Sequence, residues 1–232
     1  MSAPTTAMIL AAGLGTRMGA LTRDRPKPLL SVAGRPLLDH ALVRAAEAGA
    51  TRLIVNVHWC ADQIRAHLAG RNVLISDETD VLLDTGGGVR RALPLLGPDP
   101  VFTLNSDAIW TGPAPLPALA AAWDPARHDA LLLLVARAEA RAHAGAGDFH
   151  LSGDRPARRG AAETAPYVFT GAQILHPRAL AGFPDGPFSM NAVWNRLLAA
   201  DRLGAVVHRG GWVDVGTPEG LAAADALLAG AP

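Results

Sequence analysis

Residues 7–18 read Ala7-Met8-Ile9-Leu10-Ala11-Ala12-Gly13-Leu14-Gly15-Thr16-Arg17-Met18, an apolar run directly followed by a glycine loop. A short apolar run that ends at glycines is typical of a buried strand. The small residues after it allow backbone N–H groups to approach phosphate oxygens closely, and Arg17 adds a forked cation. The stretch therefore predicts a first strand that leads into a polyphosphate-binding loop.

The next part of the chain repeats the step from strand to helix, and Gly49 and Gly70 are placed like helix C-caps. The patterns predict strands at 7–12, 51–58, 73–76, 101–105, 130–135, 167–175 and 205–208. They predict helices at 36–48, 61–69, 88–96, 116–123, 190–200 and 218–229. This order implies right-handed crossovers and a mostly parallel sheet with helices on both faces, a Rossmann-like three-layer α/β/α fold.

The alternation ends after Ala136. Residues 145–166 are rich in Gly, Ala, Arg and Pro, and we expect a hairpin and loops there, over the edge of the sheet. A length of 232 residues fits one domain. We expect residues 1–6 to form a flexible tail and residues 7–232 to form a single domain.

Composition excludes several classes of protein. The 21 basic residues balance the 21 acidic ones, and the chain has no basic block, so a nucleic-acid partner is not expected. Cys60 is the only cysteine, which excludes an internal disulfide and fits a reducing compartment. The longest apolar run, 130–136, is too short to cross a bilayer, and Met1–Thr6 lacks the positive start of a secretory signal. These features predict a cytoplasmic protein with no membrane partner.

Lys27 is the only lysine of the chain, and it lies between Pro26 and Pro28. Lysine meets a phosphate as a compact point charge. Arg25 and Lys27 each precede a proline, which predicts extended backbone at both. The tripeptide alone would fit an exposed turn, but together with the upstream loop it favours phosphate binding.

Two common phosphate motifs do not match. A dinucleotide-binding turn needs G-x-G-x-x-G and an acidic residue about 20 positions later. Here position 18 is Met18, and the second strand ends in Asn56-Val57-His58. A Walker A loop needs Gly before its Lys, whereas Lys27 follows Pro26.

Two aspartates stand at predicted strand ends. Asp107 follows the strand 101–105, where open α/β sheets place their ligands. Asp214 is flanked by apolar residues, and a carboxylate in such a strand needs a partner. Mg²⁺ is typically held by one or two carboxylates together with substrate phosphates. The alternatives are that Asp107 caps the next segment and that Asp214 pairs with an arginine such as Arg209.

A third candidate is Thr85-Gly86-Gly87-Gly88 before a predicted helix. Thr85 alone would fit a helix N-cap. Three glycines favour a backbone surface that a ligand approaches closely.

The order of these motifs resembles the sugar-1-phosphate nucleotidylyltransferases (NDP-sugar pyrophosphorylases) over nearly the whole chain. Further matching pieces are Gly34-Arg35-Pro36-Leu37, Asn105-Ser106-Asp107 and Trp212-Val213-Asp214-Val215-Gly216-Thr217. The resemblance implies a GT-A-like fold, Mg²⁺ held by Asp107 and Asp214, and catalytic roles for Arg17 and Lys27 on the β- and γ-phosphates. It implies nucleotide binding by Ala11, Ala12, Gly13, Gly15, Thr16, Thr85, Gly86 and Gly87. Many members have a glycine where this chain has Asp84.

Many relatives also carry a Glu-Lys-Pro motif whose lysine meets the sugar phosphate, and this chain has no second lysine. The shorter layout resembles the N-acetylmuramate-1-phosphate α-uridylyltransferase branch, which acts in cell-wall recycling. That resemblance implies sugar binding by Asn105, Asp148 and Gly171, with UTP and N-acetylmuramic acid 1-phosphate as substrates. Asp148 could instead be a solvated loop residue.

Two other functions remain open at this point. One is a mannose- or glucose-1-phosphate nucleotidylyltransferase using GTP, dTTP or UTP, and the other is a non-catalytic regulatory subunit that binds nucleotide-sugars. The resemblance also implies a monomer or homodimer without the C-terminal left-handed β-helix of larger relatives. For the muramic substrate that the resemblance implies, the arginine-bearing loop from Arg155 to Arg159 is a candidate source of charge to compensate the sugar carboxylate.

Overall fold

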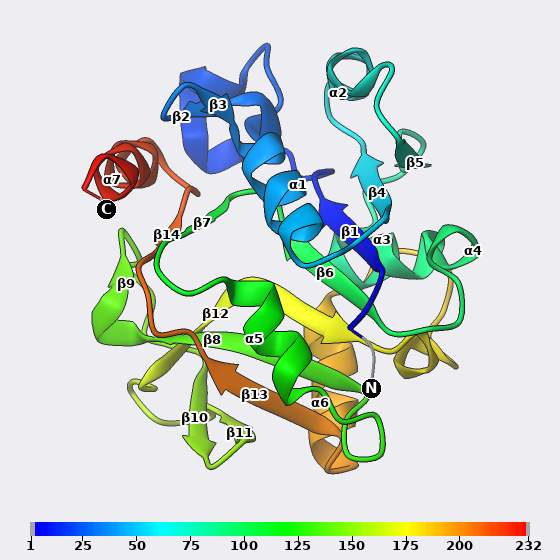
Figure 1. Cartoon of the computed structure of the whole chain (residues 1–232), viewed down its shortest axis with the longest axis vertical. Coiled ribbons are helices and arrows are strands. Elements are labelled where there is room, and N and C mark those ends of the chain that lie inside the picture. The colour runs from blue at the N-terminus through cyan, green and yellow to red at the C-terminus, as the bar shows by residue number, and fades with distance from the viewer. Residues whose placement is uncertain (1–2, 231–232) are drawn as a thin grey trace.

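The computed structural model describes residues 3–230. Its centre is a nine-stranded mixed sheet in which β8 and β13 join the path β11-β10-β12-β6-β1-β4-β5 (Figure 1). Strands β1, β4, β5 and β6 pair in parallel, whereas β12 runs antiparallel to β6 and β8. The strands are β1 (Thr6–Leu10), β4 (Arg52–Val57), β5 (Val73–Asp77), β6 (Val101–Asn105), β8 (Ala130–Ala136), β10 (Phe149–Ser152), β11 (Arg155–Arg158), β12 (Tyr167–Leu175) and β13 (Leu203–Val207).

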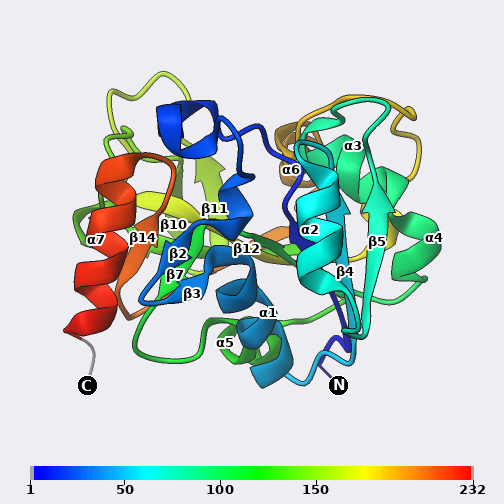
Figure 2. The same ribbon diagram turned by 90° about the horizontal axis from the view of Figure 1, so that it is seen from above.

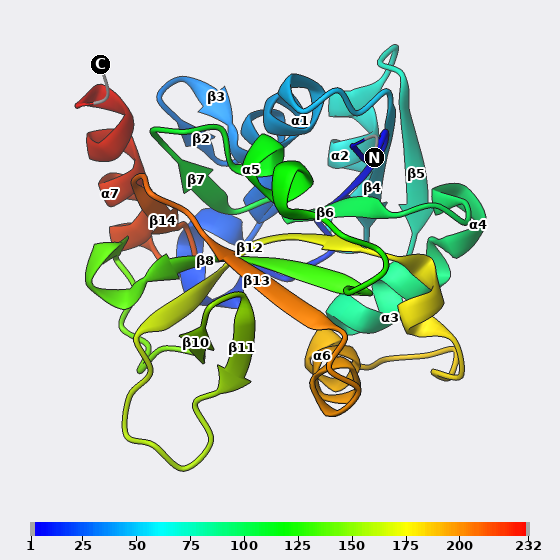
Figure 3. The same cartoon turned by 60° about the horizontal axis from the view of Figure 1, so that its bottom comes forward.

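Helices cover both faces of this sheet, as predicted (Figure 3). Alternate residues of β1 face opposite ways: Ile9 belongs to a core with α1, α2 and α5, and Met8 to a core with α3 and α6. The three-layer α/β/α architecture is thereby confirmed. The helices are α1 (Leu37–Glu47), α2 (Ala61–Leu68), α3 (Asp84–Arg91), α4 (Leu93–Leu96), α5 (Pro115–Ala122), α6 (Met190–Ala199) and α7 (Pro218–Ala229).

Two boundaries differ from the sequence-based prediction in ways that matter for the site. Strand β1 ends at Leu10, so Ala11 and Ala12 belong to the loop that follows. The helix predicted at 88–96 is two helices, α3 and α4, and α3 begins at Asp84. Pro94 lies in the first turn of α4, where its missing N–H is tolerated, but it cannot continue α3.

The hairpin predicted within 145–166 is confirmed as β10 and β11, which pair antiparallel at the edge of the sheet. Several short elements were not predicted. They are the 3-10 helices η1 (Thr16–Thr22), η2 (Lys27–Leu29), η3 (Arg137–Glu139) and η4 (Pro177–Leu180), and the strands β2 (Ser31–Val32), β3 (Arg35–Pro36), β7 (Ala108–Trp110), β9 (Ala140–Arg141) and β14 (Trp212–Asp214).

A small second sheet, in the order β7-β14-β9, connects the end of the chain to the centre of the molecule. It lies under α7, whose Ala224 and Leu227 pack with Ile109 and Val213 (Figure 2). Strand β14 runs antiparallel to β7, and the N–H of Val215 donates to the carbonyl of Asp107 at 2.8 Å. This pairing places Asp214 beside Asp107.

Thr5 and Thr6, which the sequence placed in a flexible tail, belong to the fold. Thr6 is the first residue of β1, and the carbonyl of Thr5 accepts hydrogen bonds from Thr51 and Arg52. Met1 and Ser2 lie outside the described residues. Within residues 3–230, no helix has both the length and the apolar character that a bilayer crossing requires.

Candidate active site

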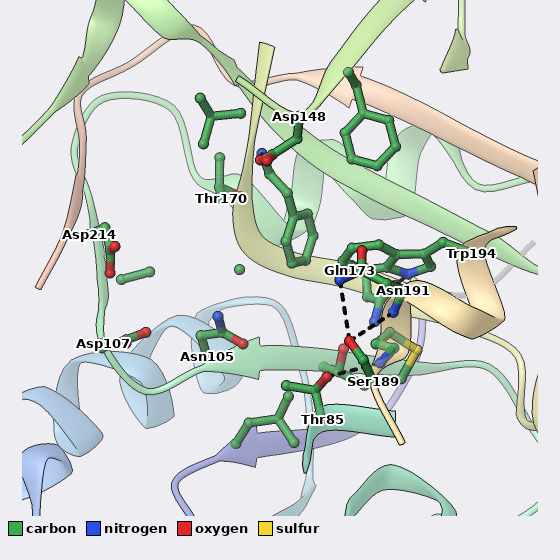
Figure 4. A pocket seen from close by; sticks show the side chains of 18 of the residues that line it. Thr85, Asn105, Asp107, Asp148, Thr170, Gln173, Ser189, Asn191, Trp194 and Asp214 are labelled. Atoms are coloured by element: carbon green, nitrogen blue, oxygen red, sulfur yellow. Dashed lines mark hydrogen bonds between the residues drawn. The ribbon is translucent and has the colours of Figure 1, made fainter. Parts of the chain in front are cut away.

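Two adjoining cavities open at the carboxyl ends of the parallel strands β1 and β6. The first, of about 430 Å³, lies beside the glycine loop and is called here the loop cavity. The second, of about 370 Å³, lies over β12 and is called the strand cavity (Figure 4). They share a wall formed by Leu10, Asp84, Thr85, Asn105 and Asp107. A ligand that fills both cavities therefore passes Asp107.

The glycine loop lines the loop cavity with Ala11, Ala12 and Gly13. Gly13 faces open space, so its backbone is accessible to a ligand, as predicted from the sequence. Gly15 has a left-handed φ of 67°, and a Cβ there would lie 3.1 Å from the Cβ of Lys27. Gly15 therefore packs the loop against the lysine segment.

Arg17 and Thr16 occupy different surroundings from the rest of the loop. Thr16 is exposed and lines neither cavity. The Arg17 side chain is 64% exposed, lines the strand cavity and lies 3.8 Å from a carboxylate oxygen of Asp214. Arg17 is thus an exposed cation that lines the strand cavity beside Asp214.

Lys27 points from the loop cavity to Asp107, with which it forms an ion pair. Its side chain is only 14% exposed, so the ammonium group is held in a confined space. The predicted extended backbone is wrong here, because Lys27 begins the 3-10 helix η2 and Leu30 donates to its carbonyl at 2.9 Å. Pro28 fits that first turn because the turn requires no N–H at its position.

Asp107 and Asp214 lie together at the edge of the strand cavity (Figure 4). Burial, and then the negative charge of Asp107, raise the pKa of Asp214, whereas the cations Arg17 and Lys27 oppose that rise. Two carboxylates that disfavour each other's ionisation provide a natural cation site. No group of three or more metal-binding side chains occurs within residues 3–230. Two carboxylates with room for substrate phosphates nevertheless fit the usual coordination of Mg²⁺.

The alternatives considered for these aspartates fare differently. Asp214 does pair with an arginine, which is Arg17 and not Arg209, so a structural ion pair stays open for it. Asp107 pairs with Lys27 and caps none of the described helices.

Gly86 and Gly87 line neither cavity, whereas the sequence predicted that they bind the nucleotide. Their N–H groups both donate to the carbonyl of Phe188, at 2.9 and 3.0 Å, and neither residue lines the two cavities. A Cβ at Gly86 would lie 2.4 Å from the Phe188 ring, and one at Gly87 would lie 2.3 Å from the carbonyl of Gly186. The glycines are needed because the segment before α6 packs directly onto α3.

Asp84 and Thr85 do line both cavities. Asp84 has a left-handed φ of 59°, a conformation that glycine adopts without strain, and its side chain accepts from the N–H of Thr85 at 2.5 Å. Thr85 is not an N-cap. Its hydroxyl accepts from the N–H of Met190 at 3.0 Å and so joins α3 to the start of α6.

Sequence reasoning missed a buried pair in the loop cavity, Asn56 and Glu78. The Asn56 side chain accepts from the N–H of Ala11 at 2.7 Å and donates to Oε1 of Glu78 at 2.7 Å. Glu78 is 1% exposed, and its Oε2 has no hydrogen-bond partner within residues 3–230. Burial raises the pKa of Glu78, and the hydrogen bond from Asn56 opposes this only in part. The polar Asn56 inside an apolar strand was the signal for this pair.

Replacing Glu78 by glutamine is expected to stabilise the unliganded protein near neutral pH. Because the folded-state pKa of Glu78 is raised, its stabilising contribution is present at low pH and is lost as the pH rises through that pKa. Glu78→Gln keeps the shape without the charge, so its melting temperature should exceed the wild-type value at pH 7 and approach it at pH 4. The exposed Glu163 gives the control Glu163→Gln, which should change neither. The prediction concerns the difference in melting temperature between Glu78→Gln and the wild-type protein, which should be larger at pH 7 than at pH 4. A smaller difference at pH 7 than at pH 4 would contradict it.

The predicted sugar-binding residues meet in the strand cavity. Asn105, Asp148 and Gly171 all line it. Gly171 has a φ of 87°, and a Cβ there would lie 2.9 Å from the Asn105 side chain, so glycine is required. Asp148 is not simply solvated, because its Oδ2 accepts from the N–H of Phe169 at 2.9 Å.

Other residues of this cavity were not predicted. They are carried by β11, β12, α6 and the loop after β9, and they include His143, Arg158, Thr170, Gln173, Asn191 and Trp194. Gln173 accepts from the indole N–H of Trp194 at 2.9 Å, which fixes the floor of the cavity. His58 and His208 contact backbone carbonyls of Glu78 and Thr111, consistent with the structural roles predicted for them.

Comparison with known proteins gives the class of this fold and site. Residues 7–181 match the family model for the MobA-like NTP transferase domain, and the chain belongs to that family. Among solved structures, a putative glucose-1-phosphate thymidylyltransferase from Bacillus anthracis superposes with a TM-score of 0.81 over 98% of this chain and 96% of its own, at 18% identity. The inositol-1-phosphate CTP transferase from T. maritima gives a TM-score of 0.79 over 99% and 98% of the two chains, at 15% identity.

Two relatives are similar along nearly their whole length. The N-acetylmuramate alpha-1-phosphate uridylyltransferase of Caulobacter vibrioides is 46% identical over 98% of this chain and 98% of its own. The protein of the same name from Neisseria meningitidis is 37% identical over 95% and 97%. The resemblance to sugar-1-phosphate nucleotidylyltransferases inferred from the sequence is therefore confirmed.

Proposed function

We propose that this enzyme joins UTP and N-acetylmuramic acid 1-phosphate to give the uridine-diphosphate sugar and pyrophosphate. The observation that carries the proposal is the meeting of the loop cavity and the strand cavity at Asp107, beside Lys27 and Asp214. A nucleotide in one cavity and a sugar phosphate in the other would bring their phosphates together there. The relatives named above support the choice of base and sugar.

In the proposed reaction, a phosphate oxygen of the sugar phosphate attacks the α-phosphorus of UTP. The bond from the α-phosphorus to the bridging oxygen breaks, and pyrophosphate leaves with the electron pair. The second pKa of a phosphate monoester is about 6, so the attacking oxygen is already ionised and needs no general base. The chain's task is to align two polyanions and to neutralise charge.

Two basic residues and the glycine loop would contribute to that task. Lys27, held in the loop cavity, would bind the phosphates that leave, and its ion pair with Asp107 would loosen as they arrive. Arg17 is exposed at the mouth of the strand cavity and would close on the same phosphates. Gly13 and its neighbours would offer backbone N–H groups to the nucleotide.

Asp107 and Asp214 would hold Mg²⁺, which when bound supplies positive charge to the α-phosphate and the nucleophile. Burial raises the pKa of Asp214 and the negative charge of Asp107 raises it further, so a bound cation would relieve the repulsion between the two carboxylates. The substrates also fit a cytoplasmic enzyme, and a muramic sugar places the reaction in cell-wall recycling.

A matrix of nucleoside triphosphates against sugar 1-phosphates tests the proposal through pyrophosphate release. We expect UTP with N-acetylmuramic acid 1-phosphate to give the highest kcat/KM. Glucose 1-phosphate or mannose 1-phosphate used at least about tenfold better would overturn the choice of sugar and leave nucleotidyl transfer in place.

Changing Asp148 to alanine is expected to raise the KM for the sugar phosphate about tenfold or more, because a charged hydrogen-bond acceptor is lost from the strand cavity. The KM for UTP should stay within about twofold, because Asp148 does not line the loop cavity. Asp148→Asn keeps an oxygen that can accept from the N–H of Phe169 but removes the negative charge. Comparing it with Asp148→Ala therefore separates the loss of the hydrogen bond to β12 from the loss of the charge in the cavity. Equal changes in the two KM values would argue against a sugar contact.

A further inference from the structure

Three arginines lie in β11 or directly after it, and two of them are engaged outside the strand cavity. Arg155 forms an ion pair with Asp201 at 3.1 Å. Arg159 donates to the backbone carbonyls of Gly147 and Ala162, at 3.1 and 3.0 Å. Arg158 alone of the three lines the strand cavity.

The Arg158 guanidinium is fixed in position by neutral groups. It lies over the rings of Phe149 and Trp194, with its central carbon 4.8 and 5.4 Å from the ring centres. Its Nε donates to the side chain of Asn195 at 2.9 Å, and its Nη2 donates to the carbonyl of Asn191 at 3.2 Å. Stacking and these hydrogen bonds therefore hold the Arg158 side chain in one position. Because all of these partners are neutral, none of them balances the positive charge.

No carboxylate lies within 4.0 Å of Arg158 in the part of the chain that the structure describes. Burial lowers the pKa of this arginine, and the charge of Asp148 opposes that only in part. A partly desolvated cation without an ion-pair partner regains free energy when an anion binds it. Arg158 is thus poised to bind an anion that enters the cavity.

The position of Arg158 indicates which anion this is. Asn191 and Trp194, which contact Arg158, lie at the opposite end of the strand cavity from Asp107 and Asp214 (Figure 4). The reacting phosphate belongs at the aspartate end, where Lys27 also lies. An anion at the Arg158 end must then be a second one, carried by the sugar itself.

We propose that Arg158 binds a carboxylate borne by the sugar, so that the strand cavity selects acidic sugar 1-phosphates over neutral ones. In N-acetylmuramic acid this group is the lactyl carboxylate. The inference rests on the proposed function, because it uses the orientation of the sugar phosphate given there.

The test compares N-acetylmuramic acid 1-phosphate with N-acetylglucosamine 1-phosphate, which lacks only the lactyl ether. Arg158→Gln should lower kcat/KM for the muramic substrate about 10- to 100-fold, mainly through KM, because a hydrogen-bonded ion pair is lost. The same variant should change kcat/KM for the neutral substrate less than about threefold. Arg158→Lys should recover part of the muramic activity, and Arg155→Gln should leave both substrates unaffected.

A second test uses N-acetylmuramic acid 1-phosphate whose lactyl carboxylate is capped as a methyl ester. This test removes the charge from the substrate, so its result does not depend on the stability of a variant. With the ester, the kcat/KM of the wild-type enzyme should fall by the same factor as that caused by Arg158→Gln with the free acid. The kcat/KM of Arg158→Gln should fall little further when the ester replaces the acid. Equal losses of both sugars in Arg158→Gln, or full wild-type activity with the ester, would overturn the inference and leave Arg158 as a support for α6. Failure of the proposed function is a separate result, namely no turnover of UTP with either sugar by the wild-type enzyme.

Discussion

Replacing Lys27 by arginine is expected to lower kcat/KM by about 100-fold or more, although the positive charge is kept. The Lys27 side chain is 14% exposed and forms an ion pair with Asp107, and its Cβ packs against Gly15 of the glycine loop. A planar guanidinium directs its N–H groups in a fixed fork and does not reproduce a point charge in this space. The measurement is steady-state pyrophosphate release with UTP and sugar 1-phosphate each varied.

Arg23→Lys is the matched control, because Arg23 is exposed in the same connection between η1 and η2. We expect this variant to keep its kcat/KM. The melting temperature of Lys27→Arg should be measured in parallel, so that loss of fold is separated from loss of phosphate binding. Activity of Lys27→Arg close to that of the wild-type enzyme would remove Lys27 from the reaction.

The sequence predicted the central fold well because its strands are short apolar runs between clear turn residues. Strands β6 and β12 were placed at the residues where the structure has them. Both are buried along most of their length, and the apolar run is then the dominant signal.

The short elements around the site were not predictable in the same way. Strands β7 and β14 have three residues each, and a run of that length is too short to show the alternation of apolar and polar residues that marks a strand. Their pairing joins segments about a hundred residues apart in the chain, and only the folded molecule shows that it places Asp214 beside Asp107. The two aspartates were found through their chemistry and the family resemblance, not through strand prediction.

The glycine triplet shows where reasoning from residue type fails. Glycine permits close approach, but the sequence does not say whether a ligand or another segment approaches. Here the partner is the chain itself, at Gly186 and Phe188. The buried Glu78 was missed for a related reason, since its neighbours along the chain are polar and its burial comes entirely from tertiary packing.

The other large effect is expected at the two aspartates. Asp107→Asn and Asp214→Asn should each remove most turnover, about 100-fold or more, because each takes one carboxylate from the proposed Mg²⁺ site. The double variant should lose little more than either single one, because residues that act as a unit give non-additive effects. Multiplicative losses would mean that the aspartates serve separate sites.

Stability measurements separate this metal site from a structural ion pair. Burial and Asp107 raise the pKa of Asp214 in the folded protein, so the ionised side chain costs stability as the pH rises through that pKa. Asp214→Asn removes that cost, and without Mg²⁺ its melting temperature at pH 7 should equal or exceed the wild-type value. Asp107→Asn breaks the ion pair with Lys27 and should melt at a lower temperature than Asp214→Asn.

Adding Mg²⁺ and UTP gives a readout that does not depend on turnover. The melting temperature of the wild-type protein should rise further with both than with UTP alone, and this additional rise should disappear in either variant. If Asp214→Asn instead melted well below the wild-type protein without Mg²⁺, its contact with Arg17 would be a structural ion pair. Asp214 would then stabilise the end of β14, and Asp107 would be left to hold the cation with the substrates.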